Sequence, residues 1–183
     1  MRITGGIHRN RRLETPKNDA VRPTSDKVRQ AIFNMLNSRG VLQEAHVLDA
    51  FCGTGALGLE ALSQGAAHCV FFDKNKNSIQ LCQANVESLK EAERSHIIFQ
   101  DTTILKERPD HIGPIDLVFL DPPYHKNLVP KSIEALYQNN WLSDEVFFVI
   151  EVAKDENVFS NFIQILNQKK YGDTKILLAM FKS

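Results

Sequence analysis

The stretch that decides the fold runs from His46 to Gly58 and reads HVLDAFCGTGALG. It begins with a short apolar run, of the kind that forms a buried strand, and continues into a turn with the spacing G-x-G-x-x-G from Gly53 to Gly58. Glycines let the backbone turn tightly and approach a ligand closely. A strand that passes through such a turn into a helix predicts a nucleotide-binding α/β unit.

Outward from this stretch, apolar runs alternate with segments of helical periodicity. Six strands are expected, at residues 47–51, 68–72, 96–99, 115–120, 146–150 and 175–181. Five helices are expected, at residues 24–40, 56–64, 75–89, 130–137 and 158–166. Nearly continuous apolar strands separated by helices are typical of an α/β fold, whose mostly parallel sheet is covered on both faces.

Length and composition limit the class of protein. A chain of 183 residues suits one domain, and 43% hydrophobic with 24% charged residues is typical of a globular protein. No apolar run approaches the roughly 20 residues of a membrane span, and the start lacks a secretory signal, so we expect a cytoplasmic protein without a membrane partner. The three cysteines form no C-x-x-C pair, so neither a disulfide framework nor a metal site is predicted.

Charge is distributed unevenly along this neutral chain. Residues 1–30 carry eight basic and three acidic side chains, and the remainder carries the compensating negative charge. We therefore divide the chain into a short basic N-terminal arm, residues 1–23, and a catalytic domain, residues 24–183. The arm could be a hairpin that contacts RNA or a solvated tail. Its candidate RNA-binding side chains are four arginines: Arg2, Arg9, Arg11 and Arg12.

Acidic residues follow several of the predicted strands, where parallel sheets bind their ligands. Asp73 ends the second strand, 20 residues after Gly53, and its carboxylate can accept hydrogen bonds from both hydroxyls of a ribose. This pairing predicts an adenosine-containing cofactor, without separating NAD from S-adenosylmethionine. Asp101 follows the third strand and fits two roles equally, as an acceptor for the adenine amino group or as a helix cap.

The tetrapeptide Asp121-Pro122-Pro123-Tyr124 directly follows the most apolar strand. Two prolines fix two φ angles and remove two N–H donors, so the segment is rigid and rich in acceptors. Such a site suits an NH2 group, and a tyrosine adds a face on which a base can stack.

The chemistry of amino methylation explains this composition. An exocyclic amine of a base is a poor nucleophile, because its lone pair is delocalised into the ring. Acceptors that hold both N–H groups favour a tetrahedral nitrogen and localise the lone pair, so that positioning and electrostatics lower the barrier. We therefore assign Asp121, Pro122, Pro123 and Tyr124 as catalytic residues.

These residues resemble a known family. Residues 49–55, DAFCGTG, resemble the first motif of Rossmann-like methyltransferases, and residues 121–124 resemble their amino-methylating signature. The opening MRITGG, the segment Arg22-Pro23-Thr24 and the late YGDT at residues 171–174 narrow the resemblance to the bacterial 16S ribosomal RNA guanine-N2 methyltransferases, the RsmD family.

The resemblance implies a class I methyltransferase fold with a seven-stranded sheet, S-adenosylmethionine as cofactor, and ribosomal RNA or an assembling small subunit as partner. It implies a flipped guanine at residues 121–124, with Arg22 and Thr24 beside it in contact with RNA. The chain departs from the family's pattern at Cys52, where a small residue such as alanine is expected, at Asp73, where glutamate is common, and in its neutral overall charge. The implied cofactor-binding residues are Asp49, Phe51, Gly53, Gly55, Asp73, Asp101 and Thr102.

Three other functions fit part of the pattern. A related methyltransferase could act on adenine N6 of DNA or on a protein glutamine. A nicotinamide-dependent oxidoreductase would explain the glycine turn but leaves residues 121–124 without a role. A non-catalytic RNA-binding module would leave an intact set of motif residues unused.

Overall fold

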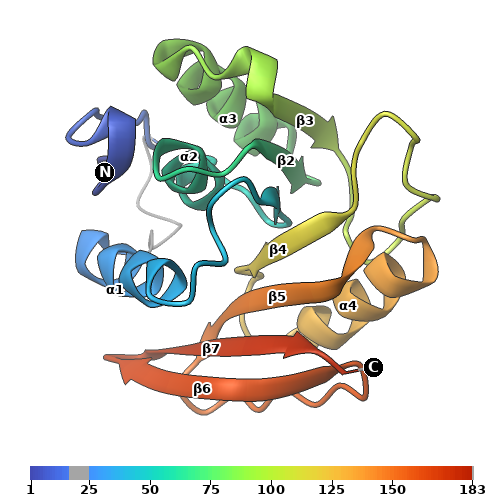
Figure 1. Cartoon of the computed structure of the whole chain (residues 1–183). Coiled ribbons are helices and arrows are strands. Elements are labelled where there is room, and N and C mark those ends of the chain that lie inside the picture. Colours follow the sequence, from blue (N-terminus) through green and yellow to red (C-terminus); the bar gives the residue numbers. More distant parts are fainter. Residues whose placement is uncertain (17–24, 183) are drawn as a thin grey trace.

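The structure, a computed structural model, describes residues 1–16 and 25–182. Its centre is a seven-stranded sheet in the order β3-β2-β1-β4-β5-β7-β6 (Figure 1). The strands are β1 (His46–Asp49), β2 (His68–Asp73), β3 (Ser95–Phe99), β4 (Ile115–Leu120), β5 (Leu142–Ala153), β6 (Ile163–Tyr171) and β7 (Thr174–Phe181). The helices are α1 (Asp26–Asn37), α2 (Ala56–Ser63), α3 (Lys76–Leu89) and α4 (Leu128–Gln138), with short 3-10 turns η1 (Gly6–His8) and η2 (Ala92–Arg94).

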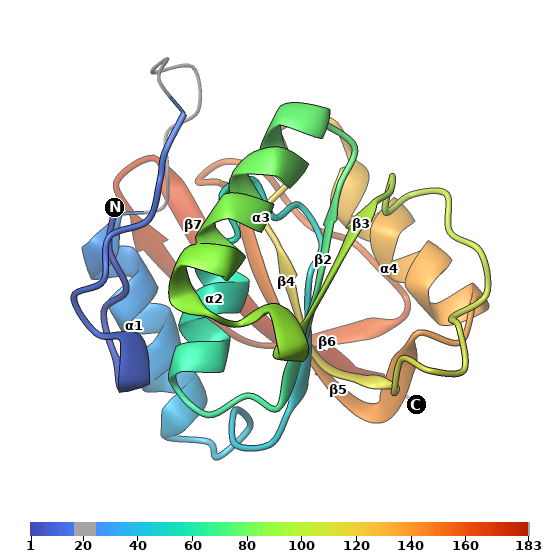
Figure 2. The ribbon, with the colours of Figure 1, turned by 90° about the horizontal axis from the view of Figure 1, so that it is seen from above.

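Helices cover both faces of the sheet, as expected for an α/β fold. Figure 2 shows α1, α2 and α3 on one face and α4 on the other. Side chains alternate between the two faces along each strand, so Phe71 and Phe119 join the core beneath α1–α3, whereas Phe72 and Phe148 join the core beneath α4. The predicted α/β fold class and its mostly parallel seven-stranded sheet are confirmed.

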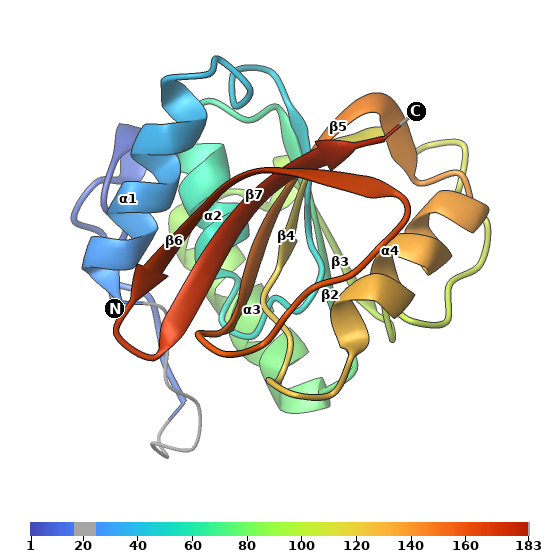
Figure 3. The same ribbon diagram turned by 90° about the horizontal axis from the view of Figure 1, so that it is seen from below.

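The order in which strands are added to the sheet reverses between β1 and β4. β1 pairs in parallel with both β2 and β4, so the chain builds outward on one side of β1 and then crosses to the other. Loops that leave such neighbouring strands diverge and open a crevice at their carboxyl ends. In Figure 3, the β4–α4 loop, the start of α3 and the β6–β7 turn lie at this same edge.

One predicted element is wrong. Residues 158–166 were expected to form a helix, because their apolar residues recur at helical spacing. Instead, residues 158–162 are irregular and Ile163–Tyr171 forms β6, an edge strand paired antiparallel to β7 through a tight turn at Gly172 (φ +60°). Pairing along the whole of β7 outweighs the weak local periodicity.

The predicted start and end of the first helix are confirmed in outline. Ser25 is the N-cap of α1, and its Oγ accepts a hydrogen bond from the Val28 N–H at 3.3 Å. Gly40, at φ +68°, closes the following turn. No helix in the described residues is long and apolar enough to cross a membrane.

Residues 1–16 fold back as a hairpin, with an isolated antiparallel bridge between Arg2 and Arg12. Ile3 and Leu13 from this hairpin are buried in the core shared with α1 and α2. This arm is therefore packed on the domain, and the predicted boundary at residue 23 lies outside the described residues.

Candidate active site

The glycine loop, residues 50–55 after β1, is held by side chains on both of its flanks. Asp49 Oδ2 accepts a hydrogen bond from the Gly58 N–H at 3.0 Å, and Asp73 Oδ2 accepts one from the Gly53 N–H at 3.0 Å. Burial raises the pKa of Asp49 to about 7, despite the bond from Gly58. Two predicted cofactor-binding carboxylates therefore also shape the loop.

The three glycines serve different purposes. A Cβ at Gly58 would lie 2.3 Å from Phe71 Cε1, and a Cβ at Gly55 would lie 2.7 Å from Cys82 Sγ, so both glycines permit close packing of α2. A Cβ at Gly53 would meet nothing within 4 Å, although its φ is +53°. The loop thus presents bare backbone to open space at Gly53, which fits the close approach of a cofactor.

The other predicted cofactor residues lie around this loop. Asp101 Oδ1 accepts hydrogen bonds from the N–H and Oγ1 of Thr103, and Lys74 Nζ lies 3.2 Å from Asp101 Oδ2. Burial alone would raise the pKa of Asp101, but these contacts outweigh it and lower the pKa. Asp101 therefore closes a turn that no helix follows, so the predicted helix-cap role is wrong.

Thr102 and Phe51 lie at the inner side of the site. Thr102 is buried and its Oγ1 donates to the Ala50 carbonyl at 2.6 Å, which joins the end of β1 to the loop after β3. Phe51 is partly buried against the core beneath α4. Thr102 therefore ties the start of the glycine loop to the loop after β3, and Phe51 anchors the glycine loop on the core.

The tetrapeptide Asp121–Tyr124 lies where β4 ends, beside the glycine loop. Asp49 on β1 pairs with Phe119 on β4, and the Ala50 N–H donates to the Phe119 carbonyl at 3.0 Å. Pro122 is buried, whereas Pro123 and Tyr124 are exposed. The two motifs that the sequence singled out therefore meet at the crevice between β1 and β4.

Two strands far along the chain fix the position of Tyr124. Its hydroxyl donates to Glu151 Oε1 on β5 at 3.2 Å and lies 3.0 Å from Thr174 Oγ1 on β7. Burial, with Glu151 and Asp121 nearby, raises the pKa of Tyr124 to about 12, so the hydroxyl stays protonated. Sequence reasoning missed Glu151, although the YGDT motif ending at Thr174 pointed to this region.

The arm is anchored by a buried carboxylate that the sequence analysis also missed. Glu60 on α2 accepts hydrogen bonds from the Thr4 N–H and Oγ1 and from the Gly5 N–H, at 2.8 to 3.0 Å. Arg29 on α1, fully buried, lies 3.5 Å from the same carboxylate. The opening MRITGG was the available signal, and its glycines let the arm touch α2, where a Cβ at Gly6 would overlap the Ser63 carbonyl.

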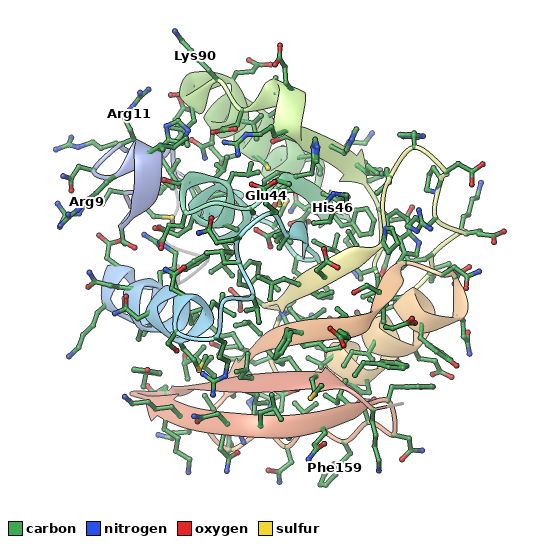
Figure 4. The ribbon with its side chains drawn as sticks, in the orientation of Figure 1. Arg9, Arg11, Glu44, His46, Lys90 and Phe159 are labelled. Carbon is green, nitrogen blue, oxygen red and sulfur yellow. The ribbon has the colours of Figure 1, made fainter. Side chains whose placement is uncertain are left out.

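The arginines of the arm lie on its surface. Arg9 and Arg11 point outward, away from the sheet (Figure 4), and Arg11 Nη2 donates to the Ser88 carbonyl at 2.9 Å. Arg2 and Arg12 line one open hollow of about 500 Å³, where Arg2 lies 3.3 Å from Asp26. The predicted residues Arg22 and Thr24 lie outside the part of the chain that the structure describes.

Comparison with known proteins shows the family to which the chain belongs. The profile of the family described as conserved hypothetical protein 95 matches residues 1–180. Ribosomal RNA small subunit methyltransferase D of Haemophilus influenzae is 34% identical over 157 residues, which cover 85% of this chain and 80% of that protein. The chain belongs to the RsmD family. Membership in the RsmD family confirms the resemblance seen in the sequence, and with it a methyltransferase that uses S-adenosylmethionine.

Solved structures agree with the family. The structure of yhhF from Escherichia coli, a methyltransferase by its name, has a TM-score of 0.84 and 30% identity, and covers 100% of this chain and 98% of that one. Magnesium protoporphyrin IX methyltransferase of Synechocystis, solved with its methyl donor bound, has a TM-score of 0.63 at 20% identity, covering 85% and 79% of the two chains. At this identity the second likeness shows only that the RsmD family shares the class I methyltransferase fold.

Proposed function

We propose that this protein transfers a methyl group from S-adenosylmethionine to the exocyclic N2 of a guanine in small-subunit (16S) ribosomal RNA. One observation carries the proposal: the tetrapeptide Asp121–Tyr124 lies beside the glycine loop, at the crevice between β1 and β4. A segment suited to an amine would then lie next to the loop proposed for the cofactor, as methyl transfer to an NH2 group requires. The names of the relatives, which act on small-subunit ribosomal RNA, support the choice of substrate.

The glycine loop and its neighbours would hold the cofactor, which supplies a methyl group on a sulfonium when bound. Asp73 would accept from the ribose hydroxyls and Asp101 from the adenine amino group, because both carboxylates lie at the carboxyl ends of adjacent strands, β2 and β3. The lowered pKa of Asp101 keeps its carboxyl ionised, so that both oxygens can accept hydrogen bonds. Asp49, Phe51 and Thr102 would support the loop and the adenine side of the site.

The tetrapeptide would hold the target amine. Asp121 would accept one N–H bond, and a backbone carbonyl of the rigid Pro122-Pro123 segment would accept the other. Tyr124 would stack on the flipped base, and its hydroxyl bonds to Glu151 and Thr174 would hold the ring in place. The proton released from nitrogen would leave through Asp121 or directly to water.

The arm would contact the RNA backbone. Arg2 and Arg12 lie opposite each other across the hairpin and line one hollow, in which Asp26 pairs with Arg2 and Arg12 adds a second positive charge. A guanidinium pairs with phosphate oxygens in two places at once, so this hollow suits a phosphate. Arg9 and Arg11 would extend the contact along the outer side of the arm.

Two experiments test the proposal. Mass spectrometry of 16S RNA nucleosides should show N2-methylguanine lost from one position in cells that lack this gene and restored by the parent gene, but not by an Asp121→Ala version. Purified protein with labelled S-adenosylmethionine should methylate small-subunit particles or their RNA. Methylation of duplex DNA or of a release-factor glutamine instead would overturn the choice of guanine and support the alternative acceptors.

A further inference from the structure

Asn85 of α3 joins the arm to the glycine loop. Its side chain is buried, with 1% of its surface exposed. Asn85 Oδ1 accepts a hydrogen bond from the Glu14 N–H at 2.7 Å, and Nδ2 donates to the Glu14 carbonyl at 3.1 Å and to the Thr54 carbonyl at 2.9 Å. One amide thus binds the end of the described arm and the middle of the glycine loop.

The surroundings of Asn85 make this link stiff. Its neighbours on α3, Cys82, Val86 and Leu89, are buried in the core, so the helix cannot easily shift. Both Nδ2 hydrogens and the oxygen of the amide are used, so a change at Glu14 that turns the amide also disturbs the bond to Thr54. A weaker contact, between Thr54 Oγ1 and Met1 Sδ at 3.7 Å, joins the same two segments.

We propose that Asn85 is a positioning residue that couples RNA binding by the arm to cofactor binding by the glycine loop. The proposal rests on the proposed function, which assigns RNA to the arm and S-adenosylmethionine to the loop. Both ligands favour the arrangement in which Glu14 and Thr54 are held by one amide, so each ligand tightens the binding of the other. An ordering contact of this kind also explains why an asparagine, and not an apolar residue, lies in this part of the core.

A double-mutant cycle tests the link without RNA. Leu13→Ala loosens the buried end of the arm next to Glu14, and Asn85→Ala removes all three bonds. The affinity for S-adenosylhomocysteine is measured by calorimetry in the parent, both single variants and the double variant. We expect Leu13→Ala to weaken binding roughly fivefold in the parent and not at all in the Asn85→Ala background, because contacting residues show non-additive effects.

Val86→Ala is the matched control, since Val86 is the next residue on α3, is equally buried and touches neither segment through a hydrogen bond. In that background Leu13→Ala should keep its full effect. A second measurement adds 16S RNA: the RNA should tighten S-adenosylhomocysteine binding about fivefold in the parent and in Val86→Ala, and leave it unchanged in Asn85→Ala.

The outcomes separate the two proposals. Additive effects of Leu13→Ala and Asn85→Ala, or RNA coupling that survives in Asn85→Ala, would overturn the role of Asn85 while leaving the proposed function intact. A parent that does not bind S-adenosylhomocysteine would refute the proposed function itself. If Asn85→Ala does not fold, the cycle is repeated with Asn85→Asp, which keeps the volume and loses both donors; if neither variant folds, Asn85 serves folding and the coupling is rejected.

Discussion

The two loops that meet at the site, one after β1 and one after β4, keep their shape in different ways. The glycine loop has flexible residues and is held from outside, by Asp49, Asp73 and Asn85. The loop after β4 carries its rigidity in Pro122 and Pro123, and the hydroxyl of Tyr124 ties its far end to β5 and β7. The glycines that let a loop follow a cofactor closely have no side chains with which to form bonds, so neighbouring residues supply them. A loop that must keep two hydrogen-bond acceptors in fixed positions can be stiffened by its own residues.

The largest expected effect tests the stiff loop. Asp121→Ala should slow methyl transfer by about 10²–10³-fold, because it removes a preorganised acceptor, and should change S-adenosylhomocysteine affinity by no more than a few fold. Single-turnover kinetics and calorimetry measure the two effects. Asp144→Ala, an exposed acid on β5, is the control and should change neither. Normal turnover by Asp121→Ala would refute the catalytic assignment.

The next effect tests the externally held loop. Asp73→Ala should weaken S-adenosylhomocysteine binding roughly 10- to 100-fold, since it loses charge-assisted bonds to the ribose and also the bond that holds the Gly53 N–H. The maximal rate at saturating cofactor should fall far less. Calorimetry and a rate titration separate these quantities. An unchanged affinity would show that the ribose binds elsewhere.

A pair of glycine substitutions separates packing from cofactor approach. Gly58→Ala places a Cβ against Phe71 and should lower the free energy of unfolding by about 1–3 kcal/mol. Gly53→Ala meets open space, so it should cost only about 1 kcal/mol of left-handed strain but weaken cofactor binding more than Gly58→Ala does. Urea unfolding and calorimetry test both. Equal losses of affinity would contradict the separate roles.

Tyr124→Phe tests the tertiary anchor of the stiff loop. It keeps the ring for stacking but loses the hydroxyl bonds to Glu151 and Thr174, so the free energy of unfolding should fall by about 1 kcal/mol. The KM for RNA should rise, and less than in Tyr124→Ala, which also lacks the ring. If both variants showed the same KM, stacking would contribute nothing and only the anchor would matter.

A pH dependence tests the flank of the glycine loop through Asp49. Burial raises the pKa of Asp49 from 3.8 to about 7, so its carboxyl is favoured in the protonated form when folded. Its contribution to stability is complete below about pH 4 and is lost as the pH rises to about 7. Asp49→Asn lacks this titration. Between about pH 4 and pH 7, urea unfolding should therefore show its free energy of unfolding rising relative to that of the parent. The stability of Asp144→Asn should change with pH as that of the parent does. If the difference in stability between Asp49→Asn and the parent stayed constant with pH, the raised pKa would be contradicted.

The sequence predicted most of the strands, both motif loops and the family, because these depend on local patterns. The glycine spacing, the apolar runs and the Pro-Pro pair each restrict the backbone within a few residues. It was wrong about residues 158–166, where helical spacing of apolar residues is outweighed by pairing with β7. It also left the arm undecided, whereas the structure packs Ile3 and Leu13 into the core. Deletion of the arm would therefore disturb folding, so surface arginines are the better target for testing RNA contact.

By itself, the sequence determined the α/β class, the place of the two loops at strand ends and the kind of chemistry that their residues suit. Only the tertiary structure decided which side chains hold those loops and the arm. Glu60, Asn85 and Glu151 are distant in sequence from the segments that they bind, and nothing in their neighbours marks them. Their roles arise because buried backbone and hydroxyl groups must find hydrogen-bond partners, and the partner is whichever polar side chain the packing of the whole chain brings within reach.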